Sequence, residues 1–239
     1  MEKMTETEFQ ESCRQRGLEL DSEQLAKFRK YTSFLVAENE KMNLTAITEE
    51  EEIYLKHYYD SLIFTYDIDF QGGVLDVGTG AGFPGVVLKI AYPEIRLTLL
   101  DSLGKRCRFL EELSRRLELE NTEVVNARGE EFTAQHREEY DWVTARAVAP
   151  LPILLEICAA AVKTGGCFVA LRGSKGHEEI EEAEYAAARL GLELESVRKE
   201  VYEDNTRIIA FYRKKKKTEK RYPRRFGEIK KEYEKRRND

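Results

Sequence analysis

Several features that mark other classes of protein are missing from this sequence. Its four cysteines form no C-x-x-C pair and its three histidines have no ligand-like spacing, so we expect no metal site. No apolar run reaches the roughly eighteen residues of a membrane span, because Glu156 interrupts the longest candidate, 151–162. Residues 1–6 lack the apolar region of a signal peptide. These absences predict a cytoplasmic protein without a membrane partner.

Charge is unevenly distributed along the chain. The 239 residues carry a formal net charge of −6, and 35% of them are charged. Residues 213–239 nevertheless contain 14 Lys or Arg against 5 Asp or Glu. A basic segment on an acidic body suggests contact with a polyanion such as nucleic acid. A solvated tail that only keeps the protein soluble would explain the same charge.

The stretch 73–84, with the sequence GVLDVGTGAGFP, organises the rest of the chain. It predicts a buried strand at 74–77, a glycine-rich turn and a helix that begins at Pro84. The spacing that binds dinucleotides, G-x-G-x-x-G, is absent, because its third glycine position holds Phe83. The turn contains three glycines that can adopt positive φ and admit a ligand close to the backbone: Gly78, Gly80 and Gly82.

Two acids beside this turn favour one kind of ligand. Asp76 stands two residues before Gly78, where a carboxylate repels a pyrophosphate but attracts an ammonium group. Asp101 follows the next predicted strand, 96–100, where a carboxylate can bind both hydroxyls of a ribose. S-adenosylmethionine carries an α-amino group and a ribose but no phosphate. The pattern therefore predicts this cofactor, and a purely structural turn is the alternative.

The pattern of hydrophobic residues divides the chain into three parts. Residues 1–70 show only helical patterns and predict an N-terminal helical cap. Residues 71–212 alternate strands and helices, which predicts an α/β, Rossmann-like domain with a mostly parallel, doubly wound sheet. Strand-like runs at 192–202 and 206–212 predict a closing antiparallel hairpin, the layout of class I S-adenosylmethionine methyltransferases. Residues 213–239 form the basic C-terminal tail.

Local signals place the individual elements. Capping boxes are predicted at Asp21 with Gln24 and at Thr48 with Glu51. The predicted parallel strands lie at 74–77, 96–100, 122–126, 140–145 and 166–171. The predicted helices lie at 5–17, 21–39, from 48 toward 66, and at 84–91, 104–118, 150–162 and 177–190.

Other polar residues follow the predicted strands. Gly129 and Glu130 come after the third strand, where a backbone N–H and a carboxylate can read the edge of an adenine. Phe83 can pack either on the cofactor or in ordinary helix–sheet contacts. Arg146 ends the fourth strand and can donate to guanine O6, hold the methionine carboxylate or form a structural ion pair.

The loop after the fourth strand narrows the methyl acceptor. It reads Ala-Arg-Ala-Val-Ala-Pro, not the Asn/Asp-Pro-Pro-Tyr/Phe sequence used to methylate exocyclic amines. Methylation of a cytosine carbon needs a cysteine nucleophile, but Cys158 and Cys167 fall in a predicted helix and strand as core residues. A ring nitrogen such as guanine N7 has an in-plane lone pair and needs no general base, so positioning suffices.

Three segments, DVGTGAGFPG (76–85), LLDSLGKR (99–106) and TARAVAPL (144–151), closely resemble the glucose-inhibited division protein B family. Its members are bacterial 16S ribosomal RNA guanine-N7 methyltransferases. Met-Asn-Leu-Thr (42–45), His57 with 60–62, and Arg-Tyr-Pro-Arg-Arg (221–225) also resemble family motifs. The resemblance implies methyl transfer from S-adenosylmethionine to a guanosine in the decoding region, on 16S RNA or the small ribosomal subunit.

The resemblance also implies roles for individual residues. Cofactor contacts are implied for Gly78, Phe83, Gly129, Glu130 and Arg146. Importance for catalysis is implied for Arg128 and Arg146. Contacts with RNA phosphates are implied for Lys105, Arg106, Lys175 and the tail basics, including Arg224 and Arg225. Asn43 and His57 either approach the RNA or cofactor, or serve as an ordinary turn residue and helix residue.

The chain departs from the family at three places, and two other functions remain open. The family often has Arg-Ala-Glu where this chain has 128–130, its Lys-Gly after the fifth strand appears here as Arg-Gly-Ser-Lys (172–175), and residues 229–239 replace a short Lys-x-Pro-Leu ending. The chain could methylate another substrate, or be a non-catalytic ribosome-assembly factor that binds RNA. The intact acids and glycines argue against the second. No long amphipathic seam suggests a dimer, so we expect a monomer.

Overall fold

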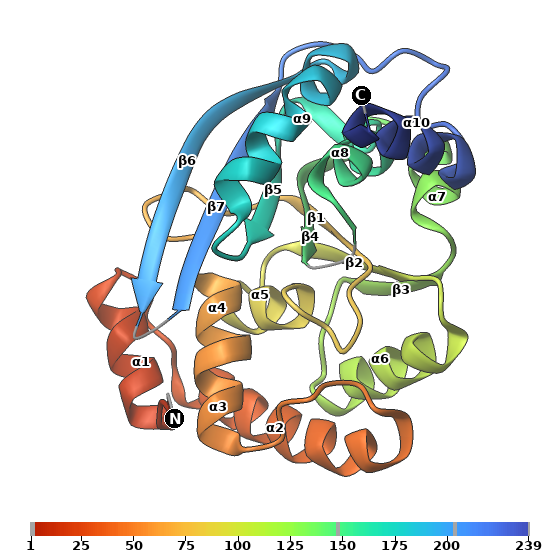
Figure 1. Ribbon diagram of the computed structural model, residues 1–239. Helices are drawn as coiled ribbons and strands as arrows, with labels where there is room; N and C mark the ends of the chain where they lie inside the picture. Colours follow the sequence, from red (N-terminus) through yellow and green to blue (C-terminus); the bar gives the residue numbers. More distant parts are fainter. Residues whose placement is uncertain (1–2, 147–148, 203–204, 239) are drawn as a thin grey trace. The chain divides into compact units, whose positions relative to one another are not determined.

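The structure, a computed structural model, describes residues 3–146, 149–202 and 205–238 in two compact units. Unit 1 comprises Met1–Gly72 and Thr79–Asn126, and unit 2 comprises Gly73–Gly78 and Ala127–Asp239. The seven strands form one mostly parallel sheet in the order β3-β2-β1-β4-β5-β7-β6, with antiparallel pairing at the β7–β6 end (Figure 1). This confirms the predicted α/β class.

The first part of unit 1 is helical, as predicted. It contains α1 (Glu6–Gln15), α2 (Ser22–Met42), α3 (Glu50–Ile53), the π-helical segment η1 (Tyr54–Tyr59) and α4 (Asp60–Leu62). The capping box at the start of α2 is confirmed, because Asp21 and Gln24 each accept a hydrogen bond from the other's backbone N–H at 2.8 Å. The box predicted for Thr48 is wrong: Glu49 is the N-cap and makes no side-chain cap bond. Three glutamates in the first turn of α3 stabilise its positive dipole end instead.

Aromatic rings hold these helices together. Phe9 of α1, Phe28 of α2 and Tyr54 and Tyr58 of η1 are all fully buried, and the closest pair of ring centroids is 4.9 Å apart. Phe9 meets Phe28 edge-on at 5.2 Å, and Tyr54 meets Tyr58 edge-on at the same distance. Edge-to-face contacts of this kind are favourable for aromatic quadrupoles. The ring cluster therefore fixes η1 against α1 and α2 within unit 1.

The second part of unit 1 carries two parallel strands and two helices. Strands β2 (Arg96–Asp101) and β3 (Thr122–Asn126) pair in register from Leu97 with Thr122 to Asp101 with Asn126. Helix α5 (Gly85–Ala91) is buried along its whole length, as its apolar sequence requires. Helix α6 (Gly104–Arg116) joins β2 to β3. All four elements lie where the sequence predicts them.

Unit 2 contains the remaining strands. They are β1 (Gly73–Val77), β4 (Tyr140–Arg146), β5 (Val162–Arg172), β6 (Leu192–Tyr202) and β7 (Asn205–Lys214). β1, β4 and β5 pair in parallel, whereas β7 runs antiparallel to β5 and β6. The predicted hairpin is confirmed; residues 203 and 204 of its turn lie outside the described residues. β5 begins at Val162, earlier than the predicted 166.

The described residues of unit 2 form four helices, and two of them were not predicted. They are α7 (Gly129–Gln135), α8 (Leu151–Ala159), α9 (Gly176–Leu190) and α10 (Phe226–Asn238). α7 is too short to show a helical period, and α10 lies in the basic tail. Within the described part of the chain, no helix is both long and apolar enough to span a bilayer.

The basic tail is docked on unit 2 over much of its length. β7 continues to Lys214, whose side chain is 1% exposed. Tyr222 and Ile229 are buried, and α10 packs against α8 (Figure 1). The guanidinium of Arg224 donates to both carboxylate oxygens of Glu156 on α8, at 2.8 and 2.6 Å. Residues 213–238 therefore do not form a freely solvated tail.

Candidate functional site

The glycine turn has the backbone conformation that its sequence predicts. Gly78, Gly80 and Gly82 have φ of +70°, +64° and +102°, values that favour glycine. Gly82 has a second, internal reason to be glycine. A Cβ at this position would lie 2.7 Å from Val86 Cγ2 and 2.8 Å from Tyr31 Oη. Its assigned cofactor contact remains a prediction beside this packing role.

Asp101 braces the glycine turn from the end of β2. Its Oδ2 accepts hydrogen bonds from the Gly80 backbone N–H at 3.0 Å and from Arg106 at 3.4 Å, and its Oδ1 accepts one from the Leu103 N–H at 2.9 Å. The residue is only 3% exposed. A carboxylate offers about four acceptor positions, so one position is left for a ribose hydroxyl. Asp101 thus has an observed structural role, and its ribose contact remains a prediction.

A buried hydroxyl in each unit lacks a protein partner. In unit 1, Thr79 is 2% exposed, and its Oγ1 has no hydrogen-bond partner among the described residues. In unit 2, the same is true of Thr144 on β4, which is 1% exposed. Buried polar atoms are normally bonded, so each unpaired one calls for an explanation. A polar ligand beside the glycine turn would supply one for Thr79, and a polar ligand at the end of β4 would supply one for Thr144.

Asp76 lies on β1 in unit 2 and is fully buried. It stands opposite Thr144 of β4 in the parallel register. Burial, assisted by the negative charge of Asp76, raises the pKa of the Cys158 thiol. Cys158 is therefore a protonated core residue, as predicted, and burial likewise raises the pKa of Cys167 to about 12. Neither thiol is suited to be the nucleophile of carbon methylation.

Residues 128–130 form the start of α7. Arg128 is its exposed N-cap, and Gly129 and Glu130 are half-buried in its first turn. A Cβ on Gly129 would lie 2.7 Å from Ile157 Cγ2 and 3.3 Å from Val77 Cγ1. An alanine at position 129 would therefore be too close to Ile157. This contact explains why the chain has Arg-Gly-Glu here and not Arg-Ala-Glu. The adenine contacts of Gly129 and Glu130 and the catalytic role of Arg128 remain predictions.

Phe83 packs inside unit 1. Its ring stacks on His57 with centroids 4.2 Å apart and on Tyr31 with centroids 5.5 Å apart, and the residue is 5% exposed. His57 is also buried, and its Nε2 lies 2.9 Å from Thr45 Oγ1. These contacts are the ordinary packing that the sequence left open as an alternative. Direct RNA or cofactor contacts of the two rings remain untested.

Two arginines predicted to face RNA are engaged within the protein. Arg106 forms the ion pair with Asp101 described above and is partly exposed. Arg224 bonds to the buried Glu156 and also to Glu232, at 2.7 Å. In the sequence, Glu156 stands out only as a break in an apolar run. A lone acid in such a run signals a buried charge that requires a partner, and the structure identifies the partner as Arg224.

The other predicted RNA contacts lie on the surface of their own unit. Lys105, Lys175, Arg225 and Asn43 are exposed. Asn43 has φ +50° and ends α2 as its C-cap, which is the turn role that the sequence left open as an alternative, and its contact with RNA remains a prediction. Arg146 ends β4 opposite Leu171 of β5 and is half-buried. Residues 147 and 148 of the family-like segment lie outside the described residues.

No metal centre emerges from the described residues. Within residues 3–146, 149–202 and 205–238, no three His, Cys, Asp or Glu side chains are grouped so as to hold a metal ion. All four cysteines are free thiols and buried.

Comparison with known proteins identifies relatives over most of the chain. Residues 24–209 match the GidB family model, described as rRNA small subunit methyltransferase G. The ribosomal RNA small subunit methyltransferase G of Lysinibacillus sphaericus (strain C3-41) is 46% identical over 234 residues, which is 94% of this chain and 97% of the relative. The protein of the same name from Bacillus cytotoxicus is 46% identical over 226 residues, 92% and 95% of the two chains.

Solved structures support the fold. The 16S rRNA (adenine(1408)-N(1))-methyltransferase from Catenulisporales acidiphilia, solved with its cosubstrate SAM, superposes with a TM-score of 0.50. It shares 18% identity and covers 62% of this chain and 86% of its own. At this identity the likeness concerns the fold alone.

Proposed function

This chain belongs to the rRNA small subunit methyltransferase G family, and from that premise we propose that it methylates N7 of a guanosine in the decoding region of 16S ribosomal RNA. The methyl donor is S-adenosylmethionine. One structural observation supports the proposal most: the buried carboxylate of Asp101 holds the Gly80 N–H and so fixes a turn of three positive-φ glycines. Because glycine has no Cβ, such a turn lets a ligand lie close to the backbone.

The bound cofactor supplies an electrophilic methyl group on its sulfonium, and the protein supplies orientation. Asp76 binds the ammonium group, Asp101 a ribose hydroxyl, and the backbone and carboxylate of Gly129 and Glu130 the adenine. Glycines 78, 80 and 82 and Phe83 form the contacts beside them. These roles are consistent with the burial of both aspartates and with the orphan hydroxyls of Thr79 and Thr144.

The acceptor needs no base. Guanine N7 carries its lone pair in the ring plane, so no proton leaves before attack, and the protein has only to align the two reacting atoms. Arg146 donates to guanine O6 or holds the methionine carboxylate, and Arg128 assists from the exposed start of α7. Lys105, Lys175 and Arg225 contact RNA phosphates. Arg106 and Arg224 act mainly through the ion pairs observed here.

A methyl-transfer assay tests the proposal. Purified protein with labelled S-adenosylmethionine should label small subunits from cells that lack this activity. Gly78→Asp should abolish cofactor binding, because the side chain adds bulk and charge beside the ligand; aspartate tolerates positive φ better than most residues, so backbone strain is limited. Gly17→Asp is the matched control, with φ +81° and no atom within 4 Å of a Cβ. Normal cofactor affinity in Gly78→Asp would contradict the cofactor assignment.

The same assay separates the alternatives. Cofactor binding without transfer to RNA or subunits would favour another methyl acceptor. Absence of cofactor binding in the wild-type protein would favour a non-catalytic assembly factor. We further propose a cytoplasmic monomer without a resident metal, which sedimentation and metal analysis of the active enzyme would check.

A further inference from the structure

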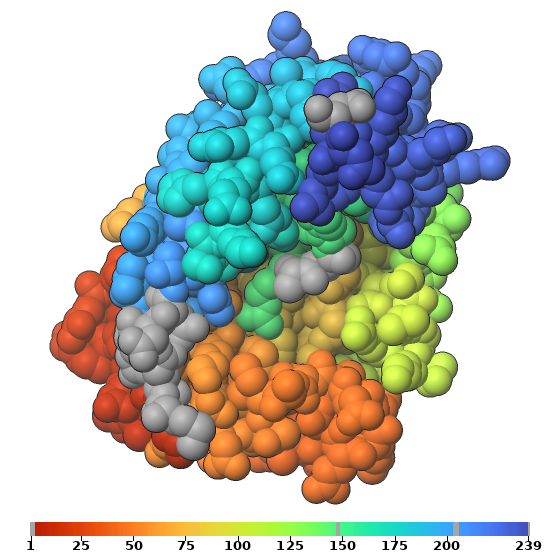
Figure 2. All heavy atoms as spheres, viewed as in Figure 1, coloured from red at the N-terminus to blue at the C-terminus, as the bar shows by residue number. Residues whose placement is uncertain are grey.

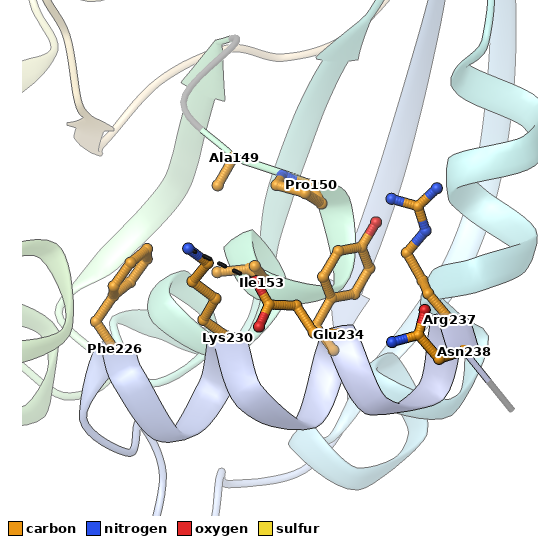
Figure 3. A pocket seen from close by; sticks show the side chains of 9 residues that line it. Ala149, Pro150, Ile153, Phe226, Lys230, Glu234, Arg237 and Asn238 are labelled. Carbon is orange, nitrogen blue, oxygen red and sulfur yellow. Dashed lines mark ion pairs between the residues drawn. The ribbon is translucent and has the colours of Figure 1, made fainter.

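A cavity of about 640 Å³ opens beside α10 in unit 2. One wall comes from the residues that lead into and begin α8: Ala149, Pro150 and Ile153. Side chains of α10 form the opposite wall, where Phe226, Lys230 and Arg237 rise from one face of the helix (Figure 3). α10 itself lies at the surface of unit 2 (Figure 2). The volume lies within the range usual for small-molecule sites.

The lining combines aromatic rings with cations. Tyr233 also lines the cavity, and its hydroxyl donates to Glu182 of α9 at 3.3 Å, which fixes the ring. Arg237 stands with its guanidinium carbon 5.8 Å from the centre of that ring. Lys230 pairs with Glu234 at 3.6 Å, but both side chains are more than half exposed. An exposed pair of this kind contributes little and exchanges readily for another anion.

We propose that this cavity binds one unpaired nucleotide of the RNA substrate, next to the methylation target. The base lies against Tyr233 or Phe226, and its phosphate is bound by Lys230 and Arg237. Aromatic faces beside a cationic groove are the usual means of binding single-stranded nucleic acid. The inference rests on the proposed RNA substrate and adds a subsite to it.

Its position in the chain supports the assignment. Ala149 is three residues after Arg146, the arginine assigned to the guanine or to the cofactor. The cavity is therefore lined by residues 149 and 150, which follow β4 closely in the sequence. Helix α10, in the basic tail, forms the opposite wall.

Matched double variants test the proposal. Lys230→Ala with Arg237→Ala removes two cations that line the cavity; Lys231→Ala with Lys235→Ala removes two exposed cations of α10 that do not. The readouts are the Kd for a fluorescein-labelled transcript of the 3′ domain of 16S RNA and the KM for subunits. The variant without Lys230 and Arg237 should raise the Kd and the KM about tenfold each. The variant without Lys231 and Lys235 should raise them no more than about twofold. Equal losses would contradict the cavity and indicate only a general effect of surface charge.

The aromatic part is tested separately. Tyr233→Leu should weaken RNA binding about fivefold without changing its dependence on salt, because a stacking face is lost and no charge. Tyr233→Phe keeps the ring and loses the hydroxyl that bonds to Glu182 and interacts with Arg237, so it should bind RNA nearly as the wild type does. Thermal unfolding of each variant reports whether α10 is still docked. A Leu variant that is folded and binds normally would overturn the stacking role.

Photo-crosslinking separates this proposal from the proposed activity. RNA that contains 4-thiouridine is irradiated with the wild-type protein, and crosslinked peptides are mapped by mass spectrometry. An adduct on Phe226 or Tyr233 is expected, and crosslinks confined to other segments would overturn the cavity. Because crosslinking needs no methyl transfer, its outcome is independent of whether N7 is the methylated atom.

Discussion

Asp101 Oδ2 and the backbone N–H of Gly80 are joined by a 3.0 Å hydrogen bond. This bond ties the end of β2 to the middle of the glycine turn. Because Asp101 is nearly fully buried, its charge and its acceptor positions are concentrated on the turn and on any ligand there. The relationship makes Asp101 both a structural brace and a candidate cofactor ligand, and the two roles have different experimental signatures.

Asp101→Asn should weaken binding of S-adenosylmethionine about tenfold, which corresponds to about 1.4 kcal/mol. The amide can still accept from Gly80, but it loses the charge paired with Arg106 and half of its acceptor capacity. Calorimetric titration measures the change. Asp69→Asn, at an exposed acid of unit 1, is the control and should bind normally. Wild-type affinity in Asp101→Asn would limit this residue to the structural role.

Glu156→Gln should lower the free energy of unfolding by about 2–3 kcal/mol. The change leaves Arg224 without its charged partner on α8. Breaking an ion pair costs about 2–3 kcal/mol when one side chain is buried and the other is partly exposed, as Glu156 and Arg224 are. Urea unfolding measures it. Glu156→Leu combined with Arg224→Leu should recover part of the loss, because no unpaired charge remains. If the double variant lost as much free energy of unfolding as Glu156→Leu and Arg224→Leu lose in sum, the two residues would not be coupled.

Gly129→Ala should destabilise the protein by about 1–3 kcal/mol through overpacking, because its Cβ would lie 2.7 Å from Ile157 Cγ2. Adding Ile157→Leu removes that methyl, since leucine has no branch at Cβ, and should restore much of the stability. Gly173→Ala is a suitable control, because no atom lies within 4 Å of a Cβ there. Thermal unfolding of the four proteins gives the comparison. No rescue by Ile157→Leu would mean that another contact excludes the methyl group.

Lys214 should make stability depend on pH in the alkaline range. Burial lowers its pKa to about 8 from the usual 10.5, and its ammonium group donates to Ala159 O at 2.5 Å and to Thr218. Between these two values the unfolded chain holds a proton that the folded protein has released, so the free energy of unfolding rises with pH, by about 1 kcal/mol per unit. Urea unfolding at pH 7.5, 8.5 and 9.5 measures the slope. Lys214→Met should remove it, and an unchanged slope would assign the effect to other groups.

The sequence predicted best the features that depend on short segments. The glycine turn, the capping box of Asp21 and Gln24 and all the strands are local patterns of spacing and polarity, and all are present. Helix α7, which was not predicted, is too short to show such a pattern. A helix was predicted across η1, but its π-helical form follows from the packing of Tyr54 and Tyr58 against α1 and α2, which no single window of sequence displays.

Long-range partners were beyond the sequence for the same reason. The pairing of Glu156 with Arg224 joins residues 68 positions apart, and the arginine alone suggested RNA. The stacking of Phe83 on His57 similarly gives internal contacts to residues that resemblance assigned to ligands. Tertiary packing therefore divides the predicted RNA and cofactor residues into those also used inside the protein and those that remain exposed.

The most direct test of the account is chemical identification of the methylated atom. Small-subunit RNA from cells that lack this protein is incubated with the enzyme and S-adenosylmethionine, and then treated with borohydride and aniline, which cleave the RNA at N7-methylguanosine. We expect a single new cleavage site, in the decoding region, that is absent with Gly78→Asp and present with Gly17→Asp. Methyl transfer without cleavage would contradict the assignment to N7.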